Sequence, residues 1–127
     1  MVGEVILAHA VGDYLLQSHW MATEKTSRWL PAVVHGVTYG LPFLLVTQSP
    51  AALAVIVLTH IVIDRFRLAR HVVWFKNQIG PKRTRPVWGE DVAGYPAATP
   101  AWLATWLMII ADNTLHLLIN VGAVMWL

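Results

Sequence analysis

The chain has 127 residues, 57% of them hydrophobic and 13% charged, with a formal net charge of +2. Soluble domains are on average about 45–50% apolar and about 25% charged, so this composition argues against a soluble globular domain and is typical of an integral membrane protein. No nucleic-acid partner is indicated, because most basic residues lie in one stretch from Arg65 to Arg85, and the lack of cysteine excludes disulfides and thiolate metal ligands.

Four apolar segments follow along the chain, each close to the roughly 17–25 residues that a membrane-spanning helix needs. They cover residues 2–21, 30–46, 50–66 and 100–127, and the third could continue to residue 78 along a membrane interface. A hydroxyl residue followed by proline, at Ser49-Pro50 and at Thr99-Pro100, is typical of a capped helix start. We therefore predict one all-α transmembrane domain over residues 1–127, a polytopic four-helix bundle with a loop over about residues 80–99.

The basic residues predict which loops face the cytoplasm. Lys25 and Arg28 follow the first segment, Arg65 to Arg85 follow the third, and the connection from Thr47 to Ala51 carries no charge. Because cytoplasmic loops of membrane proteins are enriched in Lys and Arg, both basic loops are expected to be cytoplasmic and both termini extracytoplasmic. Residues 1–16 lack a basic n-region and a small-residue cleavage site, so they are not expected to be a signal peptide.

Seven ionisable side chains fall within the apolar segments, where an unpaired charge is costly and usually marks function. They are His9, Asp13, His35, His60, Asp64, Asp112 and His116. Six of them form three pairs spaced i,i+4, which puts both side chains of a pair on one face of a helix. With the predicted topology all seven can meet in the inner half of the bilayer. Their imidazoles and carboxylates suit one or two divalent ions of the Zn, Mn or Fe type, which helical bundles bind between facing helices.

Further polar side chains extend these faces by one turn. Gln17 lies four residues beyond Asp13, Tyr39 lies four beyond His35, and Asn120 lies four beyond His116. We expect these three side chains to orient the ligands or to contact a substrate. Arg65 and Arg67 flank Asp64 on the predicted cytoplasmic side, where they could bind an anionic lipid headgroup, although arginines at such positions more often only anchor a helix end.

Two other interpretations of the His and Asp residues stay open. The residues could pair with one another as structural ion pairs that hold the helices together, or they could conduct protons or ions through the membrane. For any single pair the structural interpretation is at least as good as metal binding. Three pairs together with His35, all at compatible depth, favour a metal site.

Four runs of the chain carry most of these polar residues: AHAVGDYLLQSHWMATEK, VVHGVTYGLPFLL, LTHIVIDRFRLARH and IIADNTLHLLIN. They resemble Domain of Unknown Function 3307, a family of small bacterial and phage membrane proteins. The family pattern is His-x-x-x-Asp followed by Leu-Leu-Gln and Trp on the first helix, His on the second, Ser/Thr-His-x-x-x-Asp on the third and Asp-Gln/Asn-x-x-His on the last. In this chain the pattern falls on His9, Asp13, Gln17, Trp20, His35, His60, Asp64, Asp112, Asn113 and His116.

The resemblance implies a protein of the bacterial inner membrane, and the long loop from Gly80 to Pro100 is similar to that of the phage-type members. Asn113 stands where Gln is commoner in the family, and it joins the residues expected to orient ligands or to contact a substrate. The family name itself implies no activity, so the resemblance bears on fold and site more than on function.

Two functions follow as hypotheses. The first is a membrane-embedded metal-dependent hydrolase of a lipid-like or phosphoester substrate reached from the cytoplasmic leaflet, in which Asp13 or Asp112 takes a proton from the attacking water. The second is a non-enzymatic membrane protein, either a metal or proton carrier or a phage factor that modifies the host envelope. Four short helices leave little room for an aqueous path in a monomer, so transport would require a homo-oligomer.

Overall fold

The computed structural model describes residues 1–127 and is all-α, which confirms the predicted fold class. Its α-helices are α1 (Val2–Ala10), α2 (His19–Glu24), α3 (Trp29–Gly40), α4 (Pro50–Phe66), α5 (Leu68–Lys76) and α6 (Ala101–Trp126). Shorter turns are the π-helical η1 (Val11–Leu15) and the 3-10 turns η2 (Leu41–Leu45), η3 (Asn77–Ile79) and η4 (Lys82–Thr84). The chain divides into two compact units: the first unit is Met1–Phe66 with His116–Leu127, and the second unit is Arg67–Leu115.

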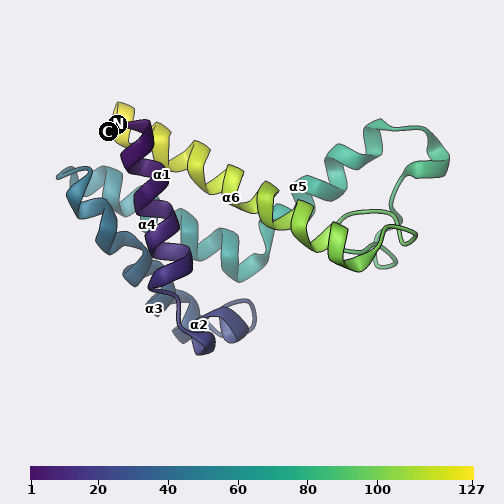
Figure 1. The fold of residues 1–127 in the computed structure, drawn as a ribbon, viewed down its shortest axis with the longest axis horizontal. Helices are drawn as coiled ribbons and strands as arrows, with labels where there is room; N and C mark the ends of the chain where they lie inside the picture. Colours follow the sequence, from purple (N-terminus) through teal and green to yellow (C-terminus); the bar gives the residue numbers. More distant parts are fainter. The chain divides into compact units, whose positions relative to one another are not determined.

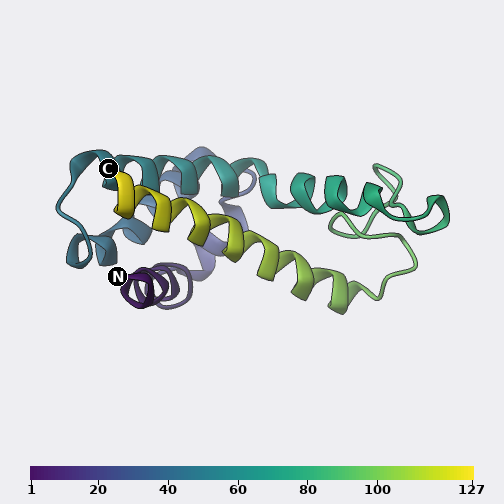
Figure 2. The same ribbon diagram turned by 90° about the horizontal axis from the view of Figure 1, so that it is seen from above.

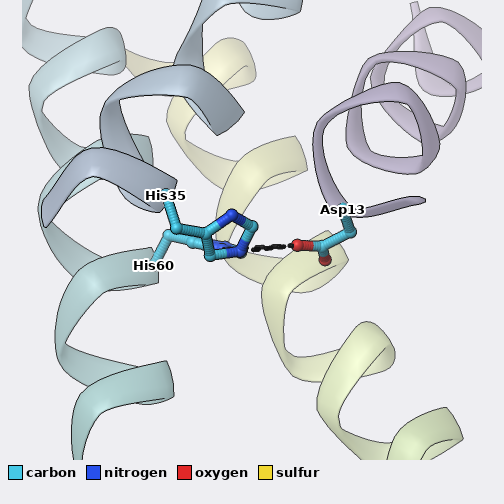
Figure 3. Close-up of side chains that lie close together, drawn as sticks. All are labelled: Asp13, His35 and His60. Carbon is cyan, nitrogen blue, oxygen red and sulfur yellow. Dashed lines mark hydrogen bonds and ion pairs between the residues drawn. The ribbon is translucent and has the colours of Figure 1, made fainter. Parts of the chain in front are cut away.

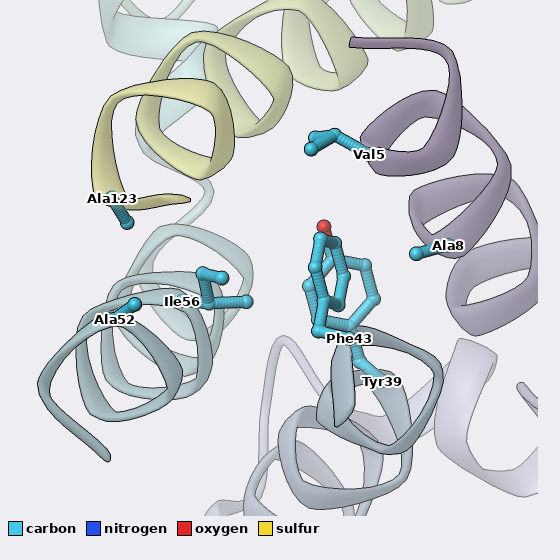
Figure 4. Close-up of a cluster of buried hydrophobic side chains, with 7 residues drawn as sticks. All are labelled: Val5, Ala8, Tyr39, Phe43, Ala52, Ile56 and Ala123. Carbon is cyan, nitrogen blue, oxygen red and sulfur yellow. The ribbon is translucent and has the colours of Figure 1, made fainter. Parts of the chain in front are cut away.

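The core of the first unit lies between α1, α3, α4 and the last turns of α6 (Figures 1 and 4). The buried side chains that form it are Val5, Ala8, Tyr39, Phe43, Ala52, Ile56 and Ala123. Figure 4 shows them directed toward one another from the surrounding helices. The Ser49 hydroxyl donates to the Leu127 carbonyl at 3.0 Å, which ties the end of α6 to the start of α4 (Figure 2).

The close packing of α3 on α4 depends on Gly36. A Cβ atom at this position would overlap the side chain of Ile61, so a larger residue would push the two helices apart. His35 and His60 are the sequence neighbours of these two residues, and their Nε2 atoms lie only 2.9 Å apart. The small residue therefore helps to bring two histidines from different helices together.

The first predicted segment, residues 2–21, is not one continuous helix. After α1 the chain widens into the π turn η1, in which the Leu16 N–H donates to the Val11 carbonyl five residues earlier. The backbone is extended at Ser18, whose hydroxyl accepts the Met21 N–H and caps the separate helix α2. The sequence predicted a single helix because apolar residues continue on both sides of Ser18. This prediction was wrong, since the Ser18 cap starts a new helix.

The second unit contains α5, the loop that follows it and the first turns of α6. The proposed continuation of the third helix to residue 78 is interrupted at Arg67, which adopts a left-handed conformation with φ of 52° between α4 and α5. From α5 the loop of residues 80–99 folds back, and the Asn77 amide donates to the Gly94 carbonyl at 2.9 Å (Figure 2). An Arg70–Asp91 ion pair of 3.1 Å links the same loop to α5.

Only α6 is long and apolar enough to cross a membrane by length and composition. Residues 29–45, which form α3 and η2, make a shorter apolar helix. A single such helix is weak support for a membrane protein, because the core helix of a soluble protein meets the same criterion. The bundle of four spans and its topology therefore stay predictions.

Candidate metal centre

Three buried side chains from three different elements converge in the first unit: Asp13 from η1, His35 from α3 and His60 from α4. Figure 3 shows both imidazoles directed at the Asp13 carboxylate. The Asp13 Oδ1 atom lies 3.2 Å from His35 Nε2 and 3.4 Å from His60 Nε2. All three residues are less than 10% exposed, so this polar cluster is shielded from solvent.

A second group shares His60 and adds Asp64 of α4 and His116 of α6. Asp64 Oδ2 lies 3.1 Å from His60 Nε2, one helical turn earlier, and 3.3 Å from His35 Nε2. Its other oxygen, Oδ1, lies 3.5 Å from His116 Nε2. The two carboxylates thus face the same pair of imidazoles.

The spacing of these atoms fits a metal ion. Around a tetrahedral ion with metal–ligand distances near 2.0–2.2 Å, neighbouring ligand atoms are about 3.3–3.6 Å apart. The distances from Asp13 Oδ1 and Asp64 Oδ2 to the two Nε2 atoms are 3.1–3.4 Å. Asp13 Oδ1 is buried and accepts no well-aligned hydrogen bond, a condition that is costly unless another partner satisfies the oxygen. The group could therefore hold a metal ion through nitrogen and oxygen donors.

Lys25 is a site residue that the sequence analysis did not assign to the site. Its Nζ atom lies 2.7 Å from Asp64 Oδ2 and 3.2 Å from His35 Nε2, and its side chain is 17% exposed. The residue follows directly after α2, so the break at Ser18 and the short helix behind it determine where the ammonium lies. Lys25 was not assigned to the site because no helical spacing relates it to the histidines, and because a basic residue in a loop indicates a cytoplasmic loop.

Tyr39 links the cluster to two other predicted residues. Its ring stacks on the His60 imidazole with centroids 3.6 Å apart. Its hydroxyl accepts a hydrogen bond of 2.6 Å from the Asn120 amide and lies 2.8 Å from His9 Nδ1. His9 belongs to neither candidate group and lies 3.6 Å from Asp13 Oδ2. Tyr39 and Asn120 are thus positioned to orient the cluster, and His9 lies at its edge.

Three further predicted residues are also absent from the candidate groups. Asp112 is half-buried one turn before His116 on α6, and it belongs to neither group. Asn113 donates to the Ile109 carbonyl of its own helix at 2.7 Å. Gln17 donates to the Asp13 carbonyl at 3.0 Å, so its side chain stabilises the backbone that carries a candidate ligand.

The two arginines predicted to bind a headgroup differ from each other. Arg65 is half-buried, donates to the Thr26 carbonyl at 2.8 Å and lies over the Trp29 ring at 5.2 Å, so it anchors the end of α4 within the protein. Arg67 is exposed at the break between α4 and α5. Arg67 is the better candidate for an external anion.

The fold and the site together define an all-helical protein with a buried His/Asp cluster that could hold a metal ion. The family described as "Protein of unknown function (DUF3307)" matches residues 2–85, more than half of the chain, and the chain belongs to this family. The matched range contains Asp13, His35, His60 and Asp64 but not the residues of α6. No curated protein and no solved structure matches the chain.

Proposed function

We propose that this protein is a membrane-embedded metal-dependent hydrolase that acts on a lipid-like phosphoester. The observation that carries the proposal is the convergence of two imidazole Nε2 atoms and two carboxylates from η1, α3 and α4 within one buried cluster. Two carboxylates and two imidazoles whose oxygen and Nε2 atoms converge on one buried point favour a metal cation between them. The proposed ion is of the Zn, Mn or Fe type, which accept such nitrogen and oxygen ligands.

The number of ions follows from His60. Both candidate groups contain His60, and the same atom, Nε2, faces Asp13 Oδ1 in one group and Asp64 Oδ2 in the other. An imidazole nitrogen has one lone pair to give to a metal. We therefore propose one ion per site, with His116 as an outer partner of Asp64.

The distribution of apolar surface supports a membrane location. Large apolar side chains are exposed on several helices, including Leu7 at 66%, Leu45 at 93% and Leu118 at 69%. Soluble monomers rarely expose large contiguous apolar surfaces, whereas a lipid-facing helix does so by necessity. Together with the length of α6 and the composition of the chain, this exposure supports a protein that meets acyl chains directly.

The chemistry assigned to the site is hydrolytic. A divalent ion at the cluster would activate water and polarise a phosphoryl oxygen. Asp13 is placed to accept a proton, because its Oδ1 atom faces the two Nε2 atoms while its Oδ2 atom lies 3.6 Å from His9 Nδ1. Arg67, which is exposed at the break between α4 and α5, is the residue that we propose for binding an anionic headgroup.

The test is a hydrolysis screen with purified protein in detergent. Short-chain phosphatidates, phosphodiester lipids and lipid amides are incubated with the protein after loading with Zn²⁺, Mn²⁺ or Fe²⁺. We expect turnover of a phosphoester lipid that chelation removes and that Asp13→Asn reduces by about 10²–10⁴-fold. Asp112→Asn, in a residue outside both groups, is the matched control and is expected to retain turnover.

No turnover on any lipid, combined with metal-dependent flux in liposomes, would overturn the hydrolase and support a carrier. Turnover that Asp112→Asn removes and Asp13→Asn leaves intact would overturn the assignment of the proton acceptor. Turnover that persists after chelation would contradict a role for the metal.

A further inference from the structure

Lys25 occupies an unusual position for a lysine, inside the shell of candidate ligands. Its ammonium contacts one carboxylate, Asp64, at 2.7 Å and one imidazole, His35, at 3.2 Å. Both contacts are made to the atoms that face the cluster, Asp64 Oδ2 and His35 Nε2. An ammonium can only donate hydrogen bonds, so His35 Nε2 is the acceptor of its contact with Lys25, and Asp64 Oδ2 is the anionic partner of an ion pair.

The same two acceptor atoms would be needed to bind a metal ion. A lone pair of His35 Nε2 or Asp64 Oδ2 can be directed to the Lys25 ammonium or to a metal, but not to both. Lys25 and a metal ion therefore compete for the site. Because the Lys25 side chain is 17% exposed and sits at the end of the short helix α2, its flexible stem can move the ammonium without disturbing the ligand helices.

The charge count then indicates what Lys25 does once a metal is bound. With neutral histidines, the carboxylates of Asp13 and Asp64 balance a divalent ion, and the Lys25 ammonium adds an uncompensated positive charge beside it. A buried net charge is costly unless a partner of opposite sign neutralises it. An anion that touches both the metal and Lys25 would supply that partner.

We propose that Lys25 is the anion-binding residue of this site: it leaves Asp64 when metal binds and, with the metal, holds a phosphate monoester group. This inference rests on the proposed metal site and adds the substrate class. It assigns two measurable roles to one lysine, because Lys25 opposes metal binding in the absence of phosphate and promotes phosphate binding in the presence of metal. A lysine that only held α2 in place would have neither role.

The experiment uses Co²⁺, whose visible absorption bands report binding to nitrogen and oxygen ligands. The full-length protein in detergent is titrated with Co²⁺ as wild type, as Lys25→Met and as Lys25→Arg. Lys82→Met, in the exposed turn η4, is the matched control for loss of a lysine. We expect Lys25→Met to bind Co²⁺ about ten- to a hundredfold more tightly than the wild type, because the lost contacts are a buried ion pair with Asp64 and a charge-assisted hydrogen bond to His35. Lys82→Met is expected to match the wild type.

Phosphate binding is then measured on the Co²⁺-loaded proteins by the paramagnetic relaxation of ³¹P. Two probes share the phosphate monoester chemistry, inorganic phosphate and dioctanoyl phosphatidate. We expect Lys25→Met to weaken binding of both by about ten- to a hundredfold, and Lys25→Arg to restore most of it because the guanidinium keeps the charge. Tighter binding of the lipid than of inorganic phosphate would identify a headgroup as the natural source, and equal binding would identify a free phosphate compound.

The outcomes separate this inference from the proposed function. If the wild type binds Co²⁺ but Lys25→Met binds it no more tightly, or binds phosphate as well as the wild type, the role of Lys25 is refuted and the metal site stands. If none of the proteins binds Co²⁺, both proposals fall. Circular dichroism of Lys25→Met checks that its helices are intact, and Lys25→Gln, which also removes the charge but stays polar, gives the same test if the methionine variant does not fold.

Discussion

The two units of this protein bury carboxylates in different ways. In the second unit the Asp91 side chain, which is fully buried, accepts hydrogen bonds from the Arg70 guanidinium at 3.1–3.2 Å and from the backbone N–H groups of Gly89 and Gly94 at 3.0 and 2.8 Å. Both of its oxygens are satisfied by donors of the chain. In the first unit Asp13 and Asp64 face imidazole nitrogens instead.

This difference separates a structural carboxylate from a candidate ligand. Asp91 has backbone donors and one arginine, which together fix the loop on α5 and leave no acceptor for anything else. Asp13 Oδ1 has no well-aligned donor although two Nε2 atoms lie within 3.4 Å. Asp91 needs no further partner, whereas Asp13 and Asp64 converge with two imidazoles at a point where a metal ion could bind, although Lys25 already pairs with Asp64.

The largest expected effect is the loss of metal affinity when a histidine ligand is replaced, which tests which histidines bind the metal. His60→Ala should weaken binding of a divalent ion by more than about 100-fold, because His60 belongs to both candidate groups. His9→Ala should weaken it by only about tenfold, because His9 contacts Tyr39 and the far oxygen of Asp13. Affinities are measured by competition with a chelating dye.

His71→Ala, an exposed histidine of α5 in the second unit, is the control and should bind as the wild type does. Equal losses for His9→Ala and His60→Ala would mean that the structure has not separated the ligands from their neighbours. Asp13 and Asp64 could then no longer be distinguished as metal ligands from the structural carboxylate Asp91.

The second prediction concerns the structural carboxylate. Asp91→Asn should destabilise the loop by about 2–3 kcal/mol, because it removes charge-assisted hydrogen bonds from a buried side chain. Hydrogen exchange should show faster exchange of the Gly94 amide, which donates to Asp91 at 2.8 Å. Metal affinity should not change, and a variant that lost metal as His60→Ala does would contradict a purely structural role for Asp91.

The third prediction tests how closely Asp13 is held. A Cβ at Gly12 would lie 2.6 Å from Tyr39 Cδ2 and 3.0 Å from the Tyr39 carbonyl, so Gly12→Ala must displace η1 from α3. We expect a loss of about 1–2 kcal/mol in unfolding free energy together with weaker metal binding, measured by chemical denaturation and dye competition. Gly3→Ala is the matched control, since a Cβ there meets nothing within 4 Å.

The smallest expected effect is the pH dependence that Asp91 of the second unit gives to the stability. Burial raises the pKa of Asp91, but the Gly94 N–H, the Arg70 guanidinium and the Gly89 N–H lower it further, so the net pKa lies below its ordinary value. A depressed folded-state pKa contributes stability that is full above the unfolded value of about 3.9 and is lost as the pH falls toward the folded value. The stability difference between wild type and Asp91→Asn should therefore shrink below about pH 4. Thermal melts followed by tryptophan fluorescence from pH 6 to pH 3 measure this, and a constant difference would contradict the pKa assignment.

The sequence predicted the all-α class and most of the residues that meet in the cluster. The i,i+4 spacing of His60 and Asp64 was sufficient because α4 is a regular helix through both positions, and their side chains are 3.1 Å apart. The same spacing was less informative for His9 and Asp13, because the π turn η1 begins between them and Asp13 is directed at α3 and α4. A spacing rule holds only where the helix type that it assumes is present.

What the sequence could not predict depends on contacts between elements. Lys25 contacts Asp64 only because the helix ends before Ser18 and the short helix α2 places Lys25 beside the cluster. The amino-acid pattern predicts neither the length of α2 nor the direction in which it runs. Asp112 is a member of neither candidate group although it is spaced i,i+4 from His116, because a shared helix face does not say which neighbour each residue meets. For Arg65 the sequence left open headgroup binding or anchoring of a helix end, and its contacts with two aromatic rings and a backbone carbonyl favour anchoring.

The most direct test of the central claim is elemental analysis of the protein as purified, compared with the triple variant His35→Ala, His60→Ala and His116→Ala. We expect about one divalent transition-metal ion per wild-type chain and none in the variant, with helical content retained in both. Equal metal in the two proteins, or no metal in the wild type even after reconstitution with Zn²⁺, Mn²⁺ and Fe²⁺, would contradict that claim.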